Sequence, residues 1–142
     1  MVQEKVLDKL DSDKLQVFVI WLPMVEGDSR TIALKSTKLI SDKRARHFWD
    51  PDKKAALAFA QMLQSSFPKA IELPKGEYPA WDVYLVYDVS TKWKDVVPVP
   101  SDWMHQLGGV DPARRLDGDK LRGSVRKLLK TKAVRAANTQ RA

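Results

Sequence analysis

The chain has 142 residues, of which 44% are hydrophobic and 30% charged, so length and composition predict a soluble globular protein rather than a disordered one. It contains no cysteine, which excludes disulfides, thiolate metal sites and thiol–disulfide exchange by the protein itself. No apolar run approaches the roughly 18 to 20 residues that span a bilayer, so we expect no integral membrane association. Because no export signal follows Met1, we expect a cytoplasmic protein if Met1 is the native start.

The net charge of +7 comes from one end of the chain. Residues 1–112 carry 15 Lys/Arg against 16 Asp/Glu, whereas residues 113–142 carry 10 against 2. Just before this basic end lie the flexible pair Gly108–Gly109 and the helix-start signal Asp111–Pro112. We therefore predict two parts. They are a body over residues 1–109 and a basic C-terminal helical extension over residues 110–142.

Apolar residues recur at helical spacing within the extension, and basic residues fill most of the positions between them. One interpretation is a basic arm that binds a polyanion. The other is a closing helix that docks its apolar stripe on the body and leaves its lysines in solvent. The extension has no aromatic residue that would stack on the bases of a single strand. The candidate polyanion contacts are Arg122, Arg126, Lys127 and Lys130.

The first forty residues predict a helix, a strand and a second helix. Residues 2–10 suit a short amphipathic helix, and the apolar run over residues 15–21 is continuous, as in a strand that is covered on both faces. Such a strand needs helices on both sides, which points to a layered α/β core. A turn over residues 25–28 then leads to a helix that Asp28 or Ser29 caps.

The next segment predicts a strand, a long helix and a loop. A short strand fits within residues 43–49. Asp50–Pro51 is a strong helix start because it offers an N-cap followed by proline at the first helical position. The resulting helix over residues 51–64 has the clearest apolar periodicity in the chain. Residues 67–79 contain three prolines and predict a loop.

The rest of the body predicts a hairpin and a short helical turn. Alternation over residues 80–89 indicates a strand, and residues 91–97 are expected to pair with it. Prolines end the second strand, and Ser101 caps a helical turn over residues 102–107. The predicted order of the body is therefore α-β-α-β-α-β-β-α, and its last two strands are antiparallel.

This order, together with two local sequences, resembles the thioredoxin fold over residues 13–108. Residues 18–24 look like the strand and approach segment before a thioredoxin active site, and Val25-Glu26-Gly27-Asp28 stands where the Cys-x-x-Cys precedes a helix. In another register Trp21-Leu22-Pro23-Met24 takes that place, because its proline matches Cys-Gly-Pro-Cys. Tyr78-Pro79-Ala80-Trp81 resembles the segment that carries the family's cis-proline.

The resemblance implies an α/β fold with a mixed central sheet of about four strands, flanking helices and a ligand cleft. It does not extend to the family's chemistry, because the nucleophilic thiolate at the start of the helix is missing here. A fold by itself assigns no function. The cleft would lie beside residues 25–28 and 78–82. Its candidate residues are Trp21, Met24, Glu26, Asp28, Pro79, Trp81 and Asp82.

Three functions stay open at this point. The five tryptophans favour binding of a peptide, a protein or a small ligand, unless they simply fill the core. An enzyme without cysteine would instead need Glu26, Asp28 or Asp82 close to a histidine. No P-loop, GxGxxG, GxSxG or HExxH motif is present, so we favour binding over catalysis and expect no cofactor. Polyanion binding by the extension is the third function.

Two further groups of side chains have both a structural and a functional interpretation. His47, Met104 and His105, together with Met24, carry the imidazole and thioether donors that copper accepts, although no ligand spacing supports such a site. Structural or surface histidines are the alternative. Asp82 follows a tryptophan at the start of an apolar strand, where an acid is costly to bury unless it is paired.

Overall fold

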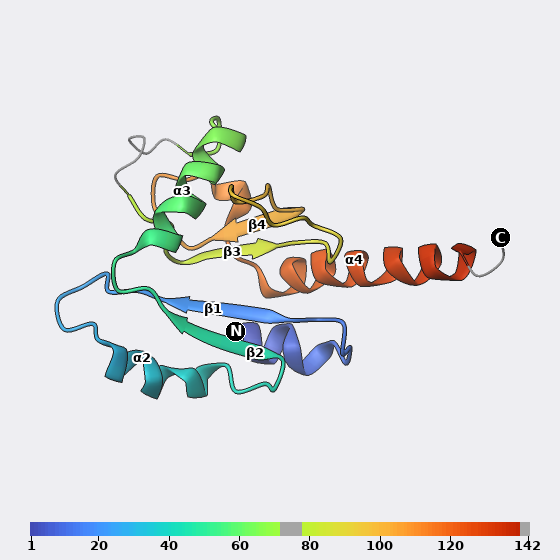
Figure 1. Ribbon diagram of the computed structural model, residues 1–142, viewed down its shortest axis with the longest axis horizontal. Coiled ribbons are helices and arrows are strands. Elements are labelled where there is room, and N and C mark those ends of the chain that lie inside the picture. Colours follow the sequence, from blue (N-terminus) through green and yellow to red (C-terminus); the bar gives the residue numbers. More distant parts are fainter. Residues whose placement is uncertain (72–77, 140–142) are drawn as a thin grey trace.

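The computed structural model describes residues 1–71 and 78–139, and side chains only as far as residue 130 within the last helix. In this part of the chain the fold is mixed α/β, with four α-helices and two small sheets (Figure 1). The helices are α1 (Val2–Lys5), α2 (Arg30–Ser36), α3 (Lys54–Ser66) and α4 (Gly118–Thr139). The strands are β1 (Val17–Trp21), β2 (Ala45–Trp49), β3 (Val83–Val86) and β4 (Asp102–His105). The short 3-10 helices are η1 (Leu7–Lys9), η2 (Thr37–Leu39) and η3 (Pro112–Arg114).

The strands pair in two separate ladders. β1 and β2 are parallel, with Val17 opposite Ala45 and Trp21 opposite Trp49, and α2 makes the crossover between them. β3 and β4 are antiparallel, with Val83 opposite His105. Among the described residues the backbone hydrogen bonds thus form two two-stranded sheets rather than the one sheet that the resemblance implies. In the view of Figure 1, β1 is drawn next to β3 and points the opposite way.

Helices cover the β3–β4 sheet on both faces. Successive residues of a strand point to opposite sides, so Met104 packs against α1 and α4 whereas Trp103 packs against α3. The buried residues of the first side are Val6, Leu10, Val86, Met104, Leu121 and Val125. Those of the second side are Met62, Leu63, Trp103 and Val110. This small sheet is therefore the middle of a three-layer core.

The position of β4 corrects the predicted hairpin. Residues 91–97 form no strand, and residues 102–105 are extended rather than helical. The segment between β3 and β4 leaves the sheet and returns where the Ser101 N–H donates to the Val86 carbonyl at 2.8 Å. Local propensity favoured a turn after Ser101, but the burial of Trp103 and Met104 on opposite faces requires a strand.

Two further local predictions were wrong. The predicted cover on both faces of β1 fails at Phe18, whose side chain is 62% exposed. The helix after Asp50–Pro51 begins only at Lys54, because Lys53 has a left-handed φ of 58°. The Asp50 carboxylate still caps this helix, since it accepts hydrogen bonds from the N–H groups of Lys54 and Ala56 at 3.0 and 3.2 Å.

The basic extension docks on the body. Leu121 and Val125 are buried in the first cluster, and Leu128 and Leu129 pack against it, so the apolar stripe of α4 is part of the core. The closing-helix interpretation is therefore confirmed for the described part of α4. Gly118 permits the close approach of α4 to α1, because a Cβ at this position would lie 2.8 Å from Cβ of Lys5. The division at residues 109 and 110 stays a prediction.

Asp111–Pro112 starts a shorter element than the sequence suggests. The Asp111 carboxylate accepts a hydrogen bond from the Ala113 N–H at 2.9 Å, and the helix that follows is only η3. Asp117 caps the long helix instead, accepting from the N–H groups of Asp119 and Lys120 at 2.9 Å each.

Arg44 attaches the N-terminal segment to the start of β2. Its guanidinium donates to the carbonyl oxygen of Leu10, to that of Leu7 at 2.8 Å and to that of Ser12 at 3.2 Å. It also pairs with both carboxylate oxygens of Asp42 at 2.7 and 2.8 Å. Both side chains are mostly buried. The Arg44 side-chain hydrogen bonds, assisted by the Arg44 backbone N–H, lower the pKa of Asp42 from 3.8 to about 2.

Acid should weaken the fold through Asp42. Because the pKa of this carboxyl is about 2 in the folded protein and ordinary in the unfolded chain, its contribution is present above pH 3.8 and is lost as the pH falls towards 2. We expect Asp42→Asn to lower the free energy of unfolding at neutral pH. The difference between the variant and wild type should shrink as the pH falls from 3.8 towards 2, because the wild-type carboxyl then becomes protonated. Urea unfolding at stepped pH measures this. Asp52→Asn, at an exposed ion pair, is the control, and a gap that does not change with pH would contradict the prediction.

The docking of α4 predicts a large effect at its apolar stripe. Leu121→Ala should lower the free energy of unfolding by about 2 to 5 kcal/mol, because it opens a cavity in the first cluster. Arg126→Ala, at an exposed position of the same helix, should change it by less than about 0.5 kcal/mol. Equal values for the two variants in urea unfolding would show that α4 does not dock in solution.

Candidate functional site

The turn over residues 25–28 is held by its own last residue. The Asp28 carboxylate accepts hydrogen bonds from the N–H groups of Met24 and Val25 at 2.8 and 2.9 Å, and these bonds lower the pKa of Asp28. Gly27 adopts a φ of 93°, which suits glycine. The cap of α2 is Ser29, whose hydroxyl accepts from the Ile32 N–H at 3.3 Å. Asp28 therefore closes a loop rather than presenting a free acid.

Trp21 and His47 bind each other across the β1–β2 sheet. The indole Nε1–H donates to Nδ1 of His47 at 3.1 Å, and the rings stack with centroids 6.0 Å apart. Nε2 of His47 lies 2.9 Å from the Ile40 carbonyl oxygen. Since Nδ1 accepts, the proton of the neutral ring belongs on Nε2, which donates to Ile40. Both ring nitrogens are thus occupied.

Both ring nitrogens of His105 are also hydrogen-bonded, but this side chain lies in the core. It is fully buried, its Nδ1 accepts from the Leu107 N–H at 3.0 Å, and its Nε2 donates to the Asp111 carbonyl at 2.9 Å. Met104 belongs to the first core cluster. No group of three or more metal-ligating His, Asp or Glu side chains occurs among the described residues, so the copper prediction gains no support.

The remaining predicted cleft residues lie in the segment before β3. Trp81 and Asp82 are exposed, and Asp82 has a φ of 51°. No cis peptide bond occurs in the described chain, so Pro79 departs from the cis-proline of the thioredoxin family. The hydrogen bonds of Trp21 and Asp28 run to His47, Met24 and Val25 rather than to this segment. Glu26 is exposed on the turn.

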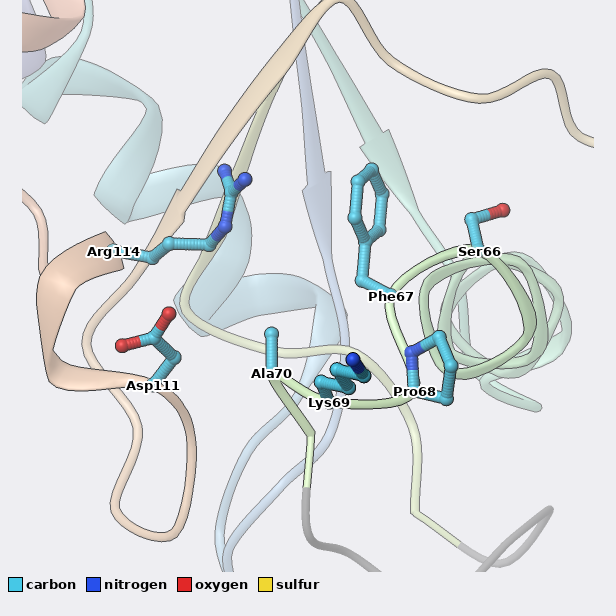
Figure 2. A pocket seen from close by; sticks show the side chains of 7 residues that line it. All are labelled: Ser66, Phe67, Pro68, Lys69, Ala70, Asp111 and Arg114. Atoms are coloured by element: carbon cyan, nitrogen blue, oxygen red, sulfur yellow. The ribbon is translucent and has the colours of Figure 1, made fainter.

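A pocket of about 380 Å³ opens elsewhere, between the C-terminal end of α3 and η3 (Figure 2). Figure 2 shows Arg114 and Asp111 on one side and Phe67 on the other, with Lys69 on the loop between them. The backbone of this region is fixed, since the Asp111 N–H donates to the Ala70 carbonyl at 2.9 Å. The residues that line the pocket are Ser66, Phe67, Pro68, Lys69, Ala70, Asp111 and Arg114.

Arg114 is the best-positioned cation of the pocket. Its guanidinium carbon lies 4.7 Å from the ring centroid of Trp103 and 5.3 Å from that of Phe67. Nη1 donates to the Trp103 carbonyl at 3.2 Å and lies 3.5 Å from Oδ1 of Asp102. Within the described chain no hydrogen bond engages Nε or Nη2, and the side chain is 32% exposed. The aromatic rings and Asp102 thus orient a guanidinium that has donors left for a ligand.

The other charged groups of the pocket have local roles. Asp111 caps η3 through its carboxylate. Lys69 is exposed just beyond the C-terminal end of α3, where the helix dipole favours a cation. Arg114 and Phe67 therefore give the pocket its chemistry, which is a planar cation beside an aromatic face. That pair suits a carboxylate attached to an apolar or aromatic group.

No pattern in the sequence predicted this pocket. Phe67-Pro68 marks the end of a helix and Arg114 lies two residues after Pro112, but neither pattern indicates a site. The two segments are far apart along the chain and meet through the Ile71–Val110 bridge and the Asp111–Ala70 hydrogen bond.

The predicted polyanion contacts lie on α4. Arg122 is engaged, since it donates to the Lys5 carbonyl at 3.1 Å and pairs with Asp119 at 2.8 Å. Arg126, Lys127 and Lys130 are exposed, whereas the apolar stripe of the same helix is turned towards the core.

Comparison with protein-family models, with curated proteins and with solved structures found no match to this chain. In the described residues, no helix is both long and apolar enough to cross a membrane.

The buried histidine predicts a stability effect. His105→Ala should lower the free energy of unfolding by about 3 kcal/mol, because it leaves the Leu107 N–H and the Asp111 carbonyl without partners in a buried place. His47→Ala, at a partly exposed position, should cost about 1 kcal/mol. Urea unfolding measures both, and equal losses would contradict the structural role of His105.

Proposed function

We propose that this chain is a non-redox binding protein whose ligand carries a carboxylate, such as a peptide C-terminus, an acidic side chain or a small aromatic acid. The ligand would enter the pocket between α3 and η3. The observation that carries the proposal is the Arg114 guanidinium, which is oriented by Trp103, Phe67 and Asp102 and keeps two nitrogens free of partners in the described chain. A fixed planar cation binds a carboxylate through two parallel hydrogen bonds.

Binding is favoured over catalysis by the partners of the two histidines. A general acid or base needs an imidazole within reach of a carboxylate or of a substrate. The ring nitrogens of His47 contact Trp21 and Ile40, and those of His105 contact backbone groups. The absence of cysteine removes thiol chemistry altogether.

The thioredoxin-like arrangement is part of the proposal. A parallel β1–β2 pair joined by a helix, followed by an antiparallel β3–β4 pair and a closing helix, is the order that the family uses. A single sheet of order β2-β1-β3-β4 would complete the likeness. Two features of the family are missing from the described chain, because the peptide bond at Pro79 is trans and the two ladders are not hydrogen-bonded to each other.

A second candidate function is polyanion binding by α4. It is favoured by Arg126, Lys127 and Lys130, which are exposed on a helix whose other face is docked. A docked helix presents its cations in a fixed row, whereas a free arm would have to become ordered on binding.

Benzoate is the first probe for the pocket. We expect it to bind wild-type protein and to shift the NMR resonances of Phe67 and of the Trp103 indole N–H, because both rings contact Arg114. Arg114→Lys keeps the charge but loses the planar guanidinium with its two parallel N–H donors. It should therefore weaken benzoate binding by on the order of tenfold.

Arg115→Lys is the matched control, because Arg115 is the exposed neighbour and undergoes the same change. Circular dichroism checks that both variants stay folded. Equal benzoate affinity for Arg114→Lys and wild type, or no binding by wild type, would contradict the carboxylate pocket.

A further inference from the structure

Two phenylalanines are exposed on one face of the β1–β2 sheet. In the parallel register Phe18 is opposite Arg46 and Ile20 is opposite Phe48, so these four side chains share a face. The rings of Phe18 and Phe48 have centroids 6.2 Å apart and an interplanar angle of 32°. Their side chains are 62% and 51% exposed. Two adjacent rings are therefore presented to solvent from neighbouring strands.

The opposite face of this sheet is occupied. It carries the stacked pair of Trp21 and His47, and His47 continues to the Ile40 carbonyl at the end of η2. Phe18 and Phe48 belong to neither core cluster. Exposed aromatic side chains that lie in contact on a regular strand surface mark a binding surface more often than isolated ones do.

The charge on the exposed face is positive. Arg46 is exposed in register with Phe18, and no ion pair engages it in the described chain. Leu15, two residues before β1, packs against the same core cluster as Leu128 and Leu129 of the basic helix α4. Lys127 and Lys130 follow the same turns of α4 and are exposed. Arg46 is thus the cation of the exposed face, and further cations lie on α4.

We propose that the face formed by Phe18, Arg46 and Phe48 binds single-stranded nucleic acid. Two bases would stack on the phenylalanine rings, and Arg46 would contact a phosphate between them. A single strand fits this face because its bases are unpaired and available for stacking, whereas a duplex keeps them inside. A second copy of the chain fits poorly, since it would bring two Arg46 side chains into one apolar interface.

Fluorescence anisotropy with a labelled oligo(dT) of about 12 nucleotides tests this proposal on the full chain. We expect binding by wild type and much weaker binding of the corresponding duplex. Phe18→Leu and Phe48→Leu keep an apolar side chain but remove the stacking ring, so each should weaken binding by on the order of tenfold. Arg46→Gln should weaken binding and reduce the slope of affinity against salt by about one ion.

Leu39→Ala and Arg30→Gln are the matched controls, because both residues are exposed on the α2–η2 segment and should not change binding. Circular dichroism verifies folding, and Arg46→Gln keeps the test valid if a phenylalanine variant unfolds. Three results would overturn the proposal: no binding by wild type, equal binding of duplex, or unchanged affinity in the folded Phe18, Phe48 and Arg46 variants. A loss only in Arg126→Gln/Lys130→Gln would assign the binding to α4 alone and would overturn it as well.

Discussion

The burial of strands β3 and β4 on both faces is the constraint on which the rest of the structure depends. Each strand has only four residues, so few backbone hydrogen bonds hold the ladder, and apolar burial must supply most of its stability. Trp103 reaches the α3 layer while Met104 beside it reaches α1 and α4. Because the sheet needs both layers, α4 is a structural helix even though most of its residues outside the apolar stripe are basic or polar.

The same burial determines what the polar side chains can do. His105 lies in the core and serves two backbone groups, and Arg44 holds three carbonyl oxygens together with Asp42. Buried polar groups stabilise a fold only when they are paired. The indole N–H of Trp103 is an exception, since it has no partner in the described chain. Among the candidate catalytic groups, Asp28, His47 and His105 are used to hold the local structure, which is why we propose binding rather than catalysis.

The two proposed binding surfaces arise where this layering stops. Beyond the end of α3, Phe67 and Trp103 flank a guanidinium that the core does not enclose. On the β1–β2 sheet one face is occupied by the Trp21–His47 pair, and the other leaves Phe18 and Phe48 in solvent. Both surfaces combine arginine with aromatic rings. They differ in shape, because the first is a pocket for a small group and the second is an open face for an extended chain.

The sequence by itself determined the properties that depend on residue type and on local period. It excluded thiol chemistry, and it predicted the order of helices and strands as far as β3, the capping role of the Asp50 carboxylate and the apolar stripe of α4. Tertiary structure decided that residues 102–105 rather than 91–97 pair with β3, that both histidines are occupied, and that Phe67 and Arg114 share a pocket. Strand pairing and pocket formation join residues that are distant along the chain. Their energies depend on neighbours that no local pattern specifies.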